Sequence, residues 1–253
     1  MQDKVINVYK KAGITPLDCI NTLKEEHPEL RLLPMTYAGR LDPLAEGVLL
    51  ILVGEECKKK DEYLNLPKEY EVDVLFGFAT DTYDVMGKIV TSGEVESKVL
   101  FKKSLEIKKI LEEFIGKIKQ KYPPYSSRPV NGEPLFKWAR DGKLDEIEIP
   151  THNVFVESIE ILGQELIKGE KLLEDIKEKI SNVKGDFRQK EIISIWNDEL
   201  KNKNTEEYSI AKLRISCGSG VYVRGIAHEI GEKLGTPALA LKIIRTKVGE
   251  FTL

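Results

Sequence analysis

The sequence predicts a domain of the α+β class, and three observations support that prediction. First, the 253 residues show no obvious break in composition, which suits one large domain or a domain with a long insertion. Second, 41% of the residues are hydrophobic and 32% are charged, as in an ordinary water-soluble globular protein. Third, segments with strand-like alternation and segments with helical spacing are mixed without regular βαβ alternation, which disfavours a doubly wound fold.

Local signals define the elements of the N-terminal half. Residues 5–9 are rich in apolar side chains and predict a first strand. Thr15 can cap a helix that begins at Pro16, because the first helical position needs no amide proton. Residues 48–53 are apolar throughout and predict a buried strand. The other expected elements of this half are a helix over 58–66, a strand over 68–78, a polar loop over 80–87 and a return strand over 88–91.

The C-terminal half carries similar signals. A helix is expected over 223–234, with Gly235 as its C-terminal stop. Residues 164–207 are rich in Lys and Glu, and we interpret them as an inserted helix followed by a hairpin or an irregular excursion. The other expected elements are a helix over 103–118, a Pro- and Tyr-rich loop over 120–131, a short helix over 134–140, strands over 153–162 and 208–217, and two closing segments over 238–244 and 248–253.

Composition excludes several classes of protein. No apolar run approaches the ~20 residues that a membrane-spanning helix needs. The first residues lack the apolar core and cleavage site of a signal peptide, so a cytoplasmic protein is expected. Cys19, Cys57 and Cys217 are scattered and the three histidines are far apart, which argues against a zinc site and against a disulfide framework.

Asp42 is the first candidate for chemistry. It lies in the turn Gly39-Arg-Leu-Asp-Pro43, directly before the apolar strand. Pro43 restricts Asp42 to an extended backbone, and a carboxylate at a rigid loop–strand junction can be held in one place against a substrate. The alternative is an Asx-turn aspartate that only organises the loop, and the turn taken alone favours this alternative.

Arg224 and Tyr70 are the next candidates. Arg224 lies at the start of a helix, where the dipole slightly disfavours a surface cation, so a partnership with a catalytic carboxylate is favoured a little. Tyr70 falls on the apolar face of the strand over 68–78, where its ring could stack on an extruded base and its hydroxyl could transfer a proton. A tyrosine that only packs in the core is an equally good interpretation.

Two weaker patterns favour structure over function. Gly218-Ser-Gly220 precedes a helix, but it has neither the GxGxxG spacing nor the βαβ context of a dinucleotide site. Asp81, Thr82 and Asp84 could hold a hard metal ion, but a loop that forms hydrogen bonds with itself is the preferred interpretation.

Five motifs, in this order, resemble those of the TruB family of tRNA pseudouridine synthases. The first, Gly39-Arg-Leu-Asp-Pro-Leu-Ala-Glu-Gly-Val-Leu49, resembles the family's catalytic motif GxLDPLATGVL. The others are Lys-Glu-Tyr-Glu at 68–71, Thr-Asp-Thr-Tyr-Asp at 80–84, the thumb-like Lys-Tyr-Pro-Pro-Tyr-Ser-Ser at 121–127 and Cys-Gly-Ser-Gly-Val-Tyr-Val-Arg-Gly-Ile at 217–226. The resemblance runs from about residue 5 to about residue 251.

The resemblance implies the pseudouridine synthase fold, in which a mixed, mainly antiparallel central sheet is flanked by helices and loops. It implies one catalytic domain over 1–253, with a thumb-like segment at about 120–150 and a charged insertion at about 164–207. The C-terminal RNA-binding PUA-type domain of the family is absent from this pattern.

The resemblance also implies a mechanism. Asp42 would attack the target uridine at the ribose or the base, the C–N glycosidic bond would break, and the uracil would rejoin through carbon. Arg224 would pair with Asp42 and help to hold the flipped nucleotide, while Tyr70 would stack on the uracil. The substrate-binding residues that it implies are Lys10, Tyr37, Arg40, Leu41, Ile243 and Arg245.

The implied partner is tRNA, recognised through its T loop, with the uridine at position 55 as the target. No metal or organic cofactor and no membrane is implied, and a monomer is expected. The sequence departs from the family pattern at Tyr37, where the family often has histidine, so Tyr37 is expected to act by stacking. It also has Lys10-Lys11 in place of Lys-Pro, and the segment at 164–207 has no counterpart in the pattern.

Three other interpretations stay open. Arg40-Leu41-Asp42 also resembles the ribosomal-RNA pseudouridine synthases, so another RNA is a possible substrate. The protein could instead be a non-catalytic module that binds or folds tRNA, although the joint presence of Asp42, Tyr70 and Arg224 speaks against lost catalysis. It could also be a scaffold that docks a partner protein on its charged insertion.

The overall charge tests the RNA interpretation. A net charge of −3 and a pI near 5.8 argue mildly against nucleic-acid binding. A local basic face can still exist, because screening limits the reach of each charge to ~8–10 Å. We therefore predict a basic face around the Asp42 cleft that includes Lys10, Lys11, Arg128, Lys137 and Arg140.

Overall fold

The computed structural model describes residues 4–93 and 104–253. Its longer strands are β1 (Lys4–Lys10), β2 (Met35–Ala38), β3 (Glu46–Val53), β4 (Lys68–Phe76), β7 (Gly116–Lys121), β10 (Thr151–Lys168), β11 (Glu207–Cys217) and β12 (Ala238–Val248). The shorter strands are β5 (Phe78–Thr80), β6 (Ile89–Ser92), β8 (Pro129–Val130), β9 (Glu133–Pro134) and β13 (Phe251–Thr252). The helices are α1 (Pro16–Glu26), α2 (Lys60–Asn65), α4 (Ser104–Glu112), α5 (Leu135–Arg140), α6 (Gly169–Ser181), α7 (Gln189–Leu200) and α8 (Val223–Leu234), with 3-10 turns η1 (Pro28–Leu30), η2 (Gly54–Lys59) and η3 (Leu144–Glu146).

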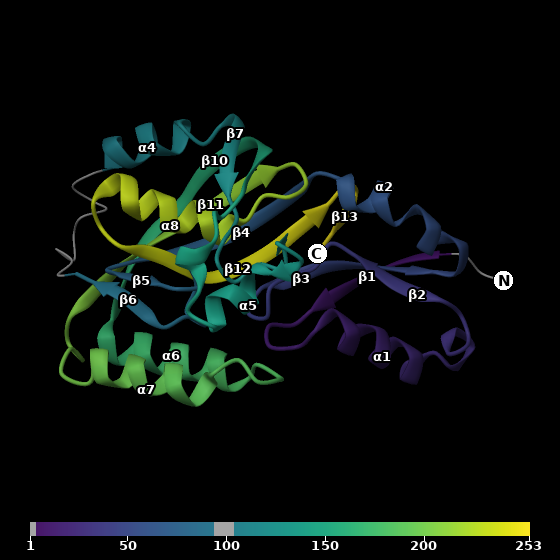
Figure 1. Cartoon of the computed structure of the whole chain (residues 1–253), viewed down its shortest axis with the longest axis horizontal. Coiled ribbons are helices and arrows are strands. Elements are labelled where there is room, and N and C mark those ends of the chain that lie inside the picture. Colours follow the sequence, from purple (N-terminus) through teal and green to yellow (C-terminus); the bar gives the residue numbers. More distant parts are fainter. Residues whose placement is uncertain (1–3, 94–103) are drawn as a thin grey trace.

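One large sheet runs through the molecule (Figure 1). Its strand order is β1-β3-β12-β4-β11-β10-β7, with β2 beside β3 and β13 beside β12. Within the described residues, every pair in this sheet is antiparallel except β3 with β12. The predicted α+β class, with a mixed and mainly antiparallel sheet, is therefore confirmed.

Alternation along the central strands gives the sheet two buried faces. In β4, Val72, Val74 and Phe76 point into a core formed with α4 and α8. Leu75 points the other way, into a second core that it shares with α6 and α7. Figure 1 shows these two pairs of helices on opposite sides of the sheet. The period of two in the sequence therefore places helices on both faces.

The N-terminal strands form a smaller lobe with its own core. Helix α1 buries Cys19, Ile20 and Leu23 against β3. Thr15 caps this helix as predicted, because its hydroxyl accepts from the backbone N–H of Asp18 while the Asp18 carboxylate accepts from that of Thr15. The strand β3 joins this lobe to the rest of the sheet through its contact with β12.

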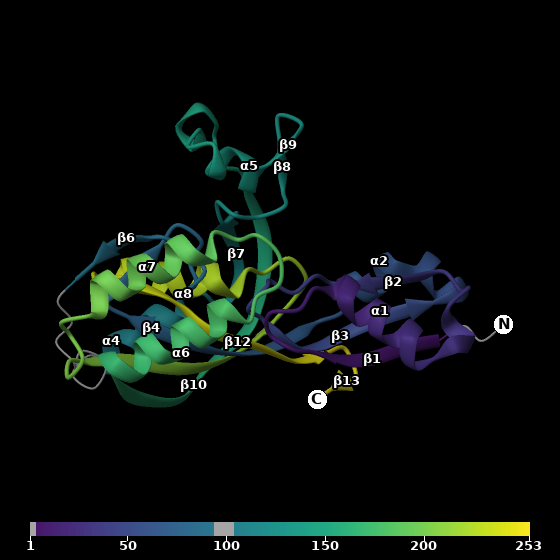
Figure 2. The same cartoon turned by 90° about the horizontal axis from the view of Figure 1, so that it is seen from below.

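A thumb-like projection stands away from the sheet. It contains β8, β9 and α5, and Figure 2 shows it extending from the end of β7 and the start of β10. Leu135 is fully buried at the start of α5, and the Trp138 indole donates to the carbonyl oxygen of Val130 at 3.1 Å. These contacts hold the projection together. The helix predicted over 134–140 is present as α5.

The structure corrects three expectations about secondary structure. The predicted helix over 103–118 ends at Glu112, and residue 103 lies outside the described residues. Gly116 then turns the chain with a φ of 94°, and Ile118 lies in β7. The loop expected over 120–131 therefore begins two residues later, because Gln120 and Lys121 end that strand. The strand expected over 153–162 is the longer β10.

The segment at 164–207 differs most from its prediction. Residues 164–168 belong to β10 and pair with β11. Residues 169–200 hold two helices, α6 and α7, and Glu207 begins β11, where a helix followed by a hairpin or irregular excursion was expected. Ile192 and Trp196 are fully buried, so α7 packs on the sheet together with α6. The pair is therefore part of the second core of the sheet.

The described residues contain neither a membrane-spanning helix nor a cluster of metal-binding side chains. No helix in these parts of the chain is long and apolar enough to cross a membrane. Residues 4–93 and 104–253 contain no cluster of three or more His, Cys, Asp or Glu side chains that could hold a metal ion. Cys19 and Cys217 are buried, Cys57 is half-buried, and all three thiols are free.

Candidate active site

A cavity of about 1010 Å³ lies where the N-terminal lobe, the thumb and the C-terminal part of the sheet meet. Its walls come from loops at the ends of strands, which is where a rigid sheet can hold side chains toward a ligand. The site residues expected from sequence that line it are Tyr37, Arg40, Leu41, Asp42, Tyr70, Arg224, Ile243 and Arg245. Lys10 is the exception, because it lies beneath the cavity wall.

Asp42 and Arg224 form the ion pair that the family resemblance implied. The Nε atom of Arg224 donates to Oδ2 of Asp42 at 2.7 Å. Its Nη1 atom donates to the carbonyl oxygen of Thr82 at 2.6 Å, and Nη2 donates to that of Tyr125 at 3.3 Å. The Arg224 side chain is 4% exposed, whereas that of Asp42 is 32% exposed. The guanidinium is thus fixed on three sides and holds a carboxylate that faces the cavity.

Lys10 supports the Asp42 turn from below. Its side chain is fully buried, and Nζ donates to four carbonyl oxygens: those of Ala45 at 2.6 Å, Lys11 at 3.3 Å, Asp42 at 3.3 Å and Pro43 at 3.4 Å. Burial lowers the pKa of Lys10 to about 8, although nearby Asp42 opposes that shift. The position of Lys10 therefore fixes the backbone of the turn.

Arg245 holds the other end of the same turn. It is 1% exposed, and it donates from Nε to the carbonyl oxygen of Val48 at 2.7 Å and from Nη2 to that of Gly39 at 3.0 Å. Gly39 has a φ of 80°, a conformation that a residue with a side chain adopts only with strain. The arginine and the glycine together set the path of the chain into Asp42.

Tyr70 and Ile243 give the cavity an apolar wall. Both lie on neighbouring strands, β4 and β12, and belong to the same buried cluster as Leu41. Burial raises the pKa of the Tyr70 phenol, while Arg245 opposes that shift, so the hydroxyl is neutral at physiological pH. An aromatic ring and an aliphatic side chain beside a carboxylate form a site suited to a flat, uncharged ring.

The loop between β5 and β6 forms hydrogen bonds with itself, as expected. Oγ1 of Thr80 donates to the carbonyl oxygen of Asp84 at 2.6 Å. The Oδ1 atom of Asp84 accepts from Oγ1 of Thr82 at 2.7 Å and from the backbone N–H of Met86 at 2.9 Å. Burial raises the pKa of Asp84 to about 6, although Arg224 opposes that shift. This bonding presents the Thr82 carbonyl to Arg224.

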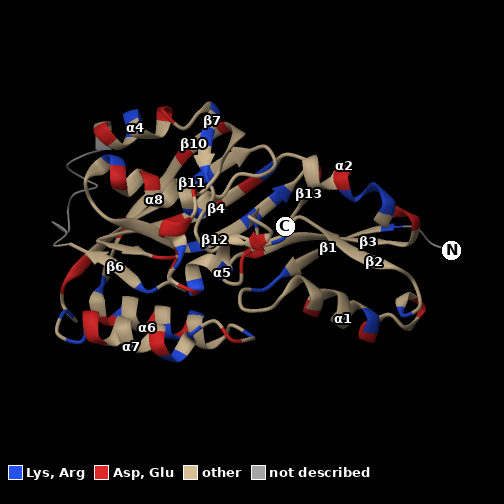
Figure 3. Cartoon of the chain, viewed as in Figure 1, with Lys and Arg blue, Asp and Glu red and all other residues tan. Residues whose placement is uncertain are grey.

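The cavity is basic although the chain is acidic overall. Among the described residues, the basic side chains that line it are Arg40, Lys68, Arg140, Lys184, Arg188, Arg224 and Arg245, whereas the acidic ones are Asp42 and Asp84. Elsewhere acidic and basic residues are mixed over the helices (Figure 3). The predicted basic face is therefore present, but its membership differs from the prediction.

Only one residue of the predicted basic set lines the cavity. That residue is Arg140, in the thumb. Lys10 is buried, and Lys11, Arg128 and Lys137 are not among the lining residues. Two of them have partners elsewhere: Lys137 pairs with Glu133 at 2.5 Å, and the Arg128 guanidinium lies 5.3 Å from the centre of the Tyr122 ring.

Sequence reasoning missed two groups of site residues. The first comprises the carbonyl oxygens of Thr82 and Tyr125, which hold Arg224; a backbone acceptor leaves no signature in residue type. The second comprises Lys184, Phe187 and Arg188, which lie between α6 and α7. The available signal for them was Lys-Gly-Asp-Phe-Arg at 184–188, a basic and aromatic loop between two periodic segments.

Comparisons with known proteins find related sequences over nearly the whole chain. A family model described as "TruB family pseudouridylate synthase (N terminal domain)" matches residues 30–167. A protein of Bacillus cereus named "tRNA pseudouridine synthase B" is 31% identical over 250 residues, which cover 98% of this chain and 67% of the relative. A protein of the same name from a Nostoc species is 34% identical over 248 residues, covering 98% and 68% of the two chains.

A solved structure, "Crystal Structure of a Cbf5-Nop10-Gar1 Complex", contains a similar fold, with a TM-score of 0.57 and 19% identity. The match covers 98% of this chain and 49% of that chain, so this chain spans about half the length of its solved neighbour. At this identity the likeness concerns the fold alone. The family match and the sequence relatives show that the chain belongs to the TruB family of pseudouridylate synthases.

Proposed function

We propose that the protein converts a uridine of tRNA into pseudouridine, and that the uridine at position 55 in the T loop is its target. The observation that carries the proposal is the Asp42–Arg224 ion pair at 2.7 Å, set in a basic cavity beside an aromatic ring. The names of the sequence relatives support tRNA as the substrate class. The position in the T loop rests on the likeness of the motifs to those of the family.

In the proposed reaction Asp42 is the nucleophile. The Asp42 carboxylate bonds to C1′ of the ribose as the bond from C1′ to N1 of uracil breaks. The detached uracil turns within the site, and its C5 then bonds to C1′ and displaces the Asp42 carboxylate. The proton on C5 then leaves and N1 takes up a proton, so the product is an isomer of the substrate and no other reactant is consumed. The fixed guanidinium of Arg224 orients Asp42 and supplies its counter-charge.

A base stacked inside an RNA loop cannot reach Asp42, so we propose that the target nucleotide is flipped out of the stack. The cavity volume of about 1010 Å³ is large enough for a nucleotide, since sites for small ligands measure roughly 300–1,000 Å³. Tyr70 would stack on the uracil, and Ile243 would close the other side of the apolar wall. Such contacts offset the cost of unstacking, which is a few kcal/mol.

The rim of the cavity is where the rest of the RNA would bind. Arg40 is exposed there and donates to the Tyr37 hydroxyl at 3.3 Å, which places a guanidinium beside an aromatic ring. Arginine with tyrosine suits an RNA loop, because one group pairs with phosphate and the other stacks on an unpaired base. We assign Tyr37 and Arg40 to this contact, whereas Lys10 and Arg245 would act by holding the turn that carries Asp42.

The proposal is tested by mapping pseudouridine on an unmodified tRNA transcript with carbodiimide-dependent reverse-transcription stops. A single new stop in the T loop, absent with Asp42→Asn, is the expected result. Stops elsewhere in the transcript would keep the chemistry and replace the target uridine. Tight tRNA binding without any stop would overturn the enzymatic proposal in favour of a binding module.

A further inference from the structure

The loop between α6 and α7, residues 182–188, reaches the candidate active site from outside the matched family region. The family model ends at residue 167, just before α6 begins. The backbone N–H of Lys184 donates to the carbonyl oxygen of Gly13 at 2.9 Å, which docks the loop on the N-terminal lobe. Three side chains of the loop line the cavity, those of Lys184, Phe187 and Arg188.

Arg188 makes the most specific contacts of this loop. Its Nη1 atom donates to Oδ2 of Asp81 at 3.0 Å and Nη2 donates to Oδ1 at 3.5 Å, which is a two-pronged pairing. The guanidinium carbon also lies 4.7 Å from the centre of the Tyr125 ring. Both charged side chains are only 22% exposed. Arginine suits this place because its planar fork can pair with a carboxylate while its face stacks on a ring.

The partners of Arg188 adjoin the two carbonyl oxygens that hold Arg224. Asp81 directly precedes Thr82, whose carbonyl accepts from Nη1 of Arg224, and Tyr125 itself supplies the carbonyl that accepts from Nη2. The Arg188 guanidinium therefore contacts both segments whose carbonyl oxygens fix the Arg224 guanidinium. Arg224 in turn holds Asp42.

We propose that Arg188 is a positioning residue of the pseudouridine synthase reaction, acting on Asp42 through Asp81, Tyr125 and Arg224. This inference rests on the proposed function. The α6–α7 pair would then contribute to catalysis, because the loop between the two helices places Arg188 in the lining of the cavity. It assigns no contact between Arg188 and the reacting uridine.

The loop is built to hold Arg188 in place. Arg188 has a φ of 63°, a left-handed conformation that costs free energy in a residue with a side chain. The side chain of Gln189 closes the loop on itself: Oε1 accepts from the N–H of Phe187 at 2.8 Å, and Nε2 donates to the carbonyl oxygens of Gly185 at 2.6 Å and Val183 at 3.1 Å. A loop restrained in this way transmits the position of α7 to the site.

The test compares single-turnover rates and tRNA affinities of the wild type, Arg188→Ala, Arg188→Lys and the control Lys190→Ala. Lys190 is an exposed cation two residues further along, outside the cavity lining. We expect the rate to fall about tenfold in both Arg188 variants, with tRNA affinity unchanged, because a small displacement of a nucleophile slows the chemical step. The control should keep the wild-type rate.

Lysine is informative because it keeps the charge but loses the fork and the stacking face. A loss of affinity at unchanged rate, rescued by Arg188→Lys, would overturn the proposal and make Arg188 a phosphate contact. An unchanged rate in Arg188→Ala would also overturn it. No turnover by the wild type would overturn the proposed function and this inference together, whereas turnover that ignores Arg188 would overturn this inference alone.

Asp81→Asn provides a second test that does not alter the α6–α7 loop. Asparagine keeps an oxygen that can accept from the backbone N–H of Lys88, which Asp81 holds at 2.8 Å, but it removes the charge opposite Arg188. We expect the same fall in rate, and no further fall in the double variant with Arg188→Ala, because the two residues act as one unit. Multiplied losses would overturn the proposed linkage, and thermal unfolding confirms that each variant is folded.

Discussion

At the residue scale, the site depends on how the hydrogen-bonding capacity of one buried arginine is used. Arg224 gives one side of its guanidinium to Asp42 and the other two to backbone carbonyl oxygens. Sequence reasoning identified Asp42, Arg224 and Tyr70 because their residue types stand in recognisable motifs. It could not identify the carbonyl partners, because any residue at those two positions presents the same oxygen.

This arrangement predicts that Arg224→Lys loses most activity. A lysine ammonium is a point charge and cannot reach three acceptors held for a planar fork, so Asp42 loses its orientation and buried carbonyl groups lose a donor. We expect the single-turnover rate to fall at least about 100-fold and the free energy of unfolding to fall by about 2 kcal/mol. Kinetics on a tRNA transcript and urea unfolding measure the two effects. A rate near that of the wild type would contradict the assigned role.

Asp84 predicts a dependence of stability on pH. Burial raises its pKa in the folded state to about 6 from 3.8, so the folded protein holds this proton more tightly than the unfolded chain. Its contribution to stability is therefore greatest below pH 3.8 and is lost as the pH rises through 6. Relative to the wild type, Asp84→Asn should gain about 1 kcal/mol in unfolding free energy between pH 5 and pH 7. Parallel pH profiles of the two proteins would disprove this.

At the element scale, local sequence patterns predicted α6 as a helix but did not decide whether α7 is a helix or a hairpin. The spacing of Leu172, Ile176 and Ile180 predicted α6. The same spacing exists at Ile192, Trp196 and Leu200, but the run Ile-Ile-Ser-Ile-Trp is rich in residues that favour strands. Tertiary packing decided between the two, because all three of these side chains are fully buried against the sheet.

A similar conflict misplaced the end of α4. Ile118 lies four residues after Phe114, so it continues the helical spacing, yet it belongs to β7. The alternating pattern of that strand happened to coincide with the helical period at this residue. Gly116, with its φ of 94°, marks the actual change of direction.

The packing of α7 predicts that its removal damages the whole fold. Trp196 is fully buried, its indole donates to the carbonyl oxygen of Val85 at 3.2 Å, and its ring meets that of Phe78 at 5.1 Å. Trp196→Ala should lower the free energy of unfolding by about 3–5 kcal/mol, whereas Ser194→Ala on the exposed face of α7 should change it by less than about 0.5 kcal/mol. Urea unfolding of both variants is the measurement. Equal, small effects would mean that the pair is a dispensable attachment.

At the scale of the whole molecule, net charge was a poor guide and the ordering of motifs was a good one. The motifs lie far apart in sequence, and the fold brings all of them to one cavity. The predicted fold is confirmed because strand alternation and motif order constrain it together. The residues of the basic face were predicted only in part. The paths of the loops decide which lysines and arginines lie on the same face, and these paths cannot be read from residue type.

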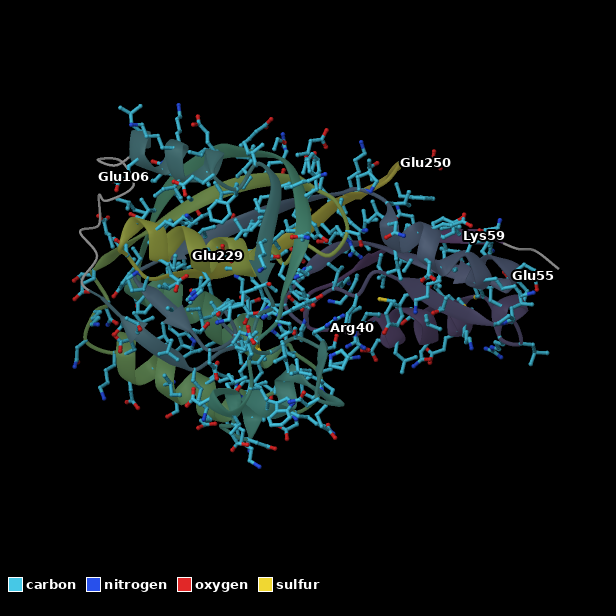
Figure 4. All side chains as sticks on the ribbon, turned by 45° about the horizontal axis from the view of Figure 1, so that its top comes forward. Arg40, Glu55, Lys59, Glu106, Glu229 and Glu250 are labelled. Atoms are coloured by element: carbon cyan, nitrogen blue, oxygen red, sulfur yellow. The ribbon has the colours of Figure 1, made fainter. Side chains whose placement is uncertain are left out.

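The basic cavity predicts that tRNA binding weakens with salt and that Arg40 contributes to this effect. Figure 4 shows Arg40 in the middle of the molecule and Lys59 at the far end of the N-terminal lobe. Arg40→Ala should lower the slope of log affinity against log salt by about 1, because one phosphate contact is lost, whereas Lys59→Ala should leave it unchanged. Filter binding over a range of salt concentrations measures both slopes. Equal slopes for the two variants would place the RNA elsewhere.

The most direct test of the central claim, that Asp42 isomerises uridine in tRNA, is tritium release from a tRNA transcript labelled at C5 of uridine. Formation of the new C1′–C5 bond must expel the hydrogen at C5, so release counts turnovers. We predict stoichiometric release by the wild type and none by Asp42→Asn, with the variant folded and binding the transcript as tightly as the wild type. Release by Asp42→Asn at the wild-type rate would contradict the account.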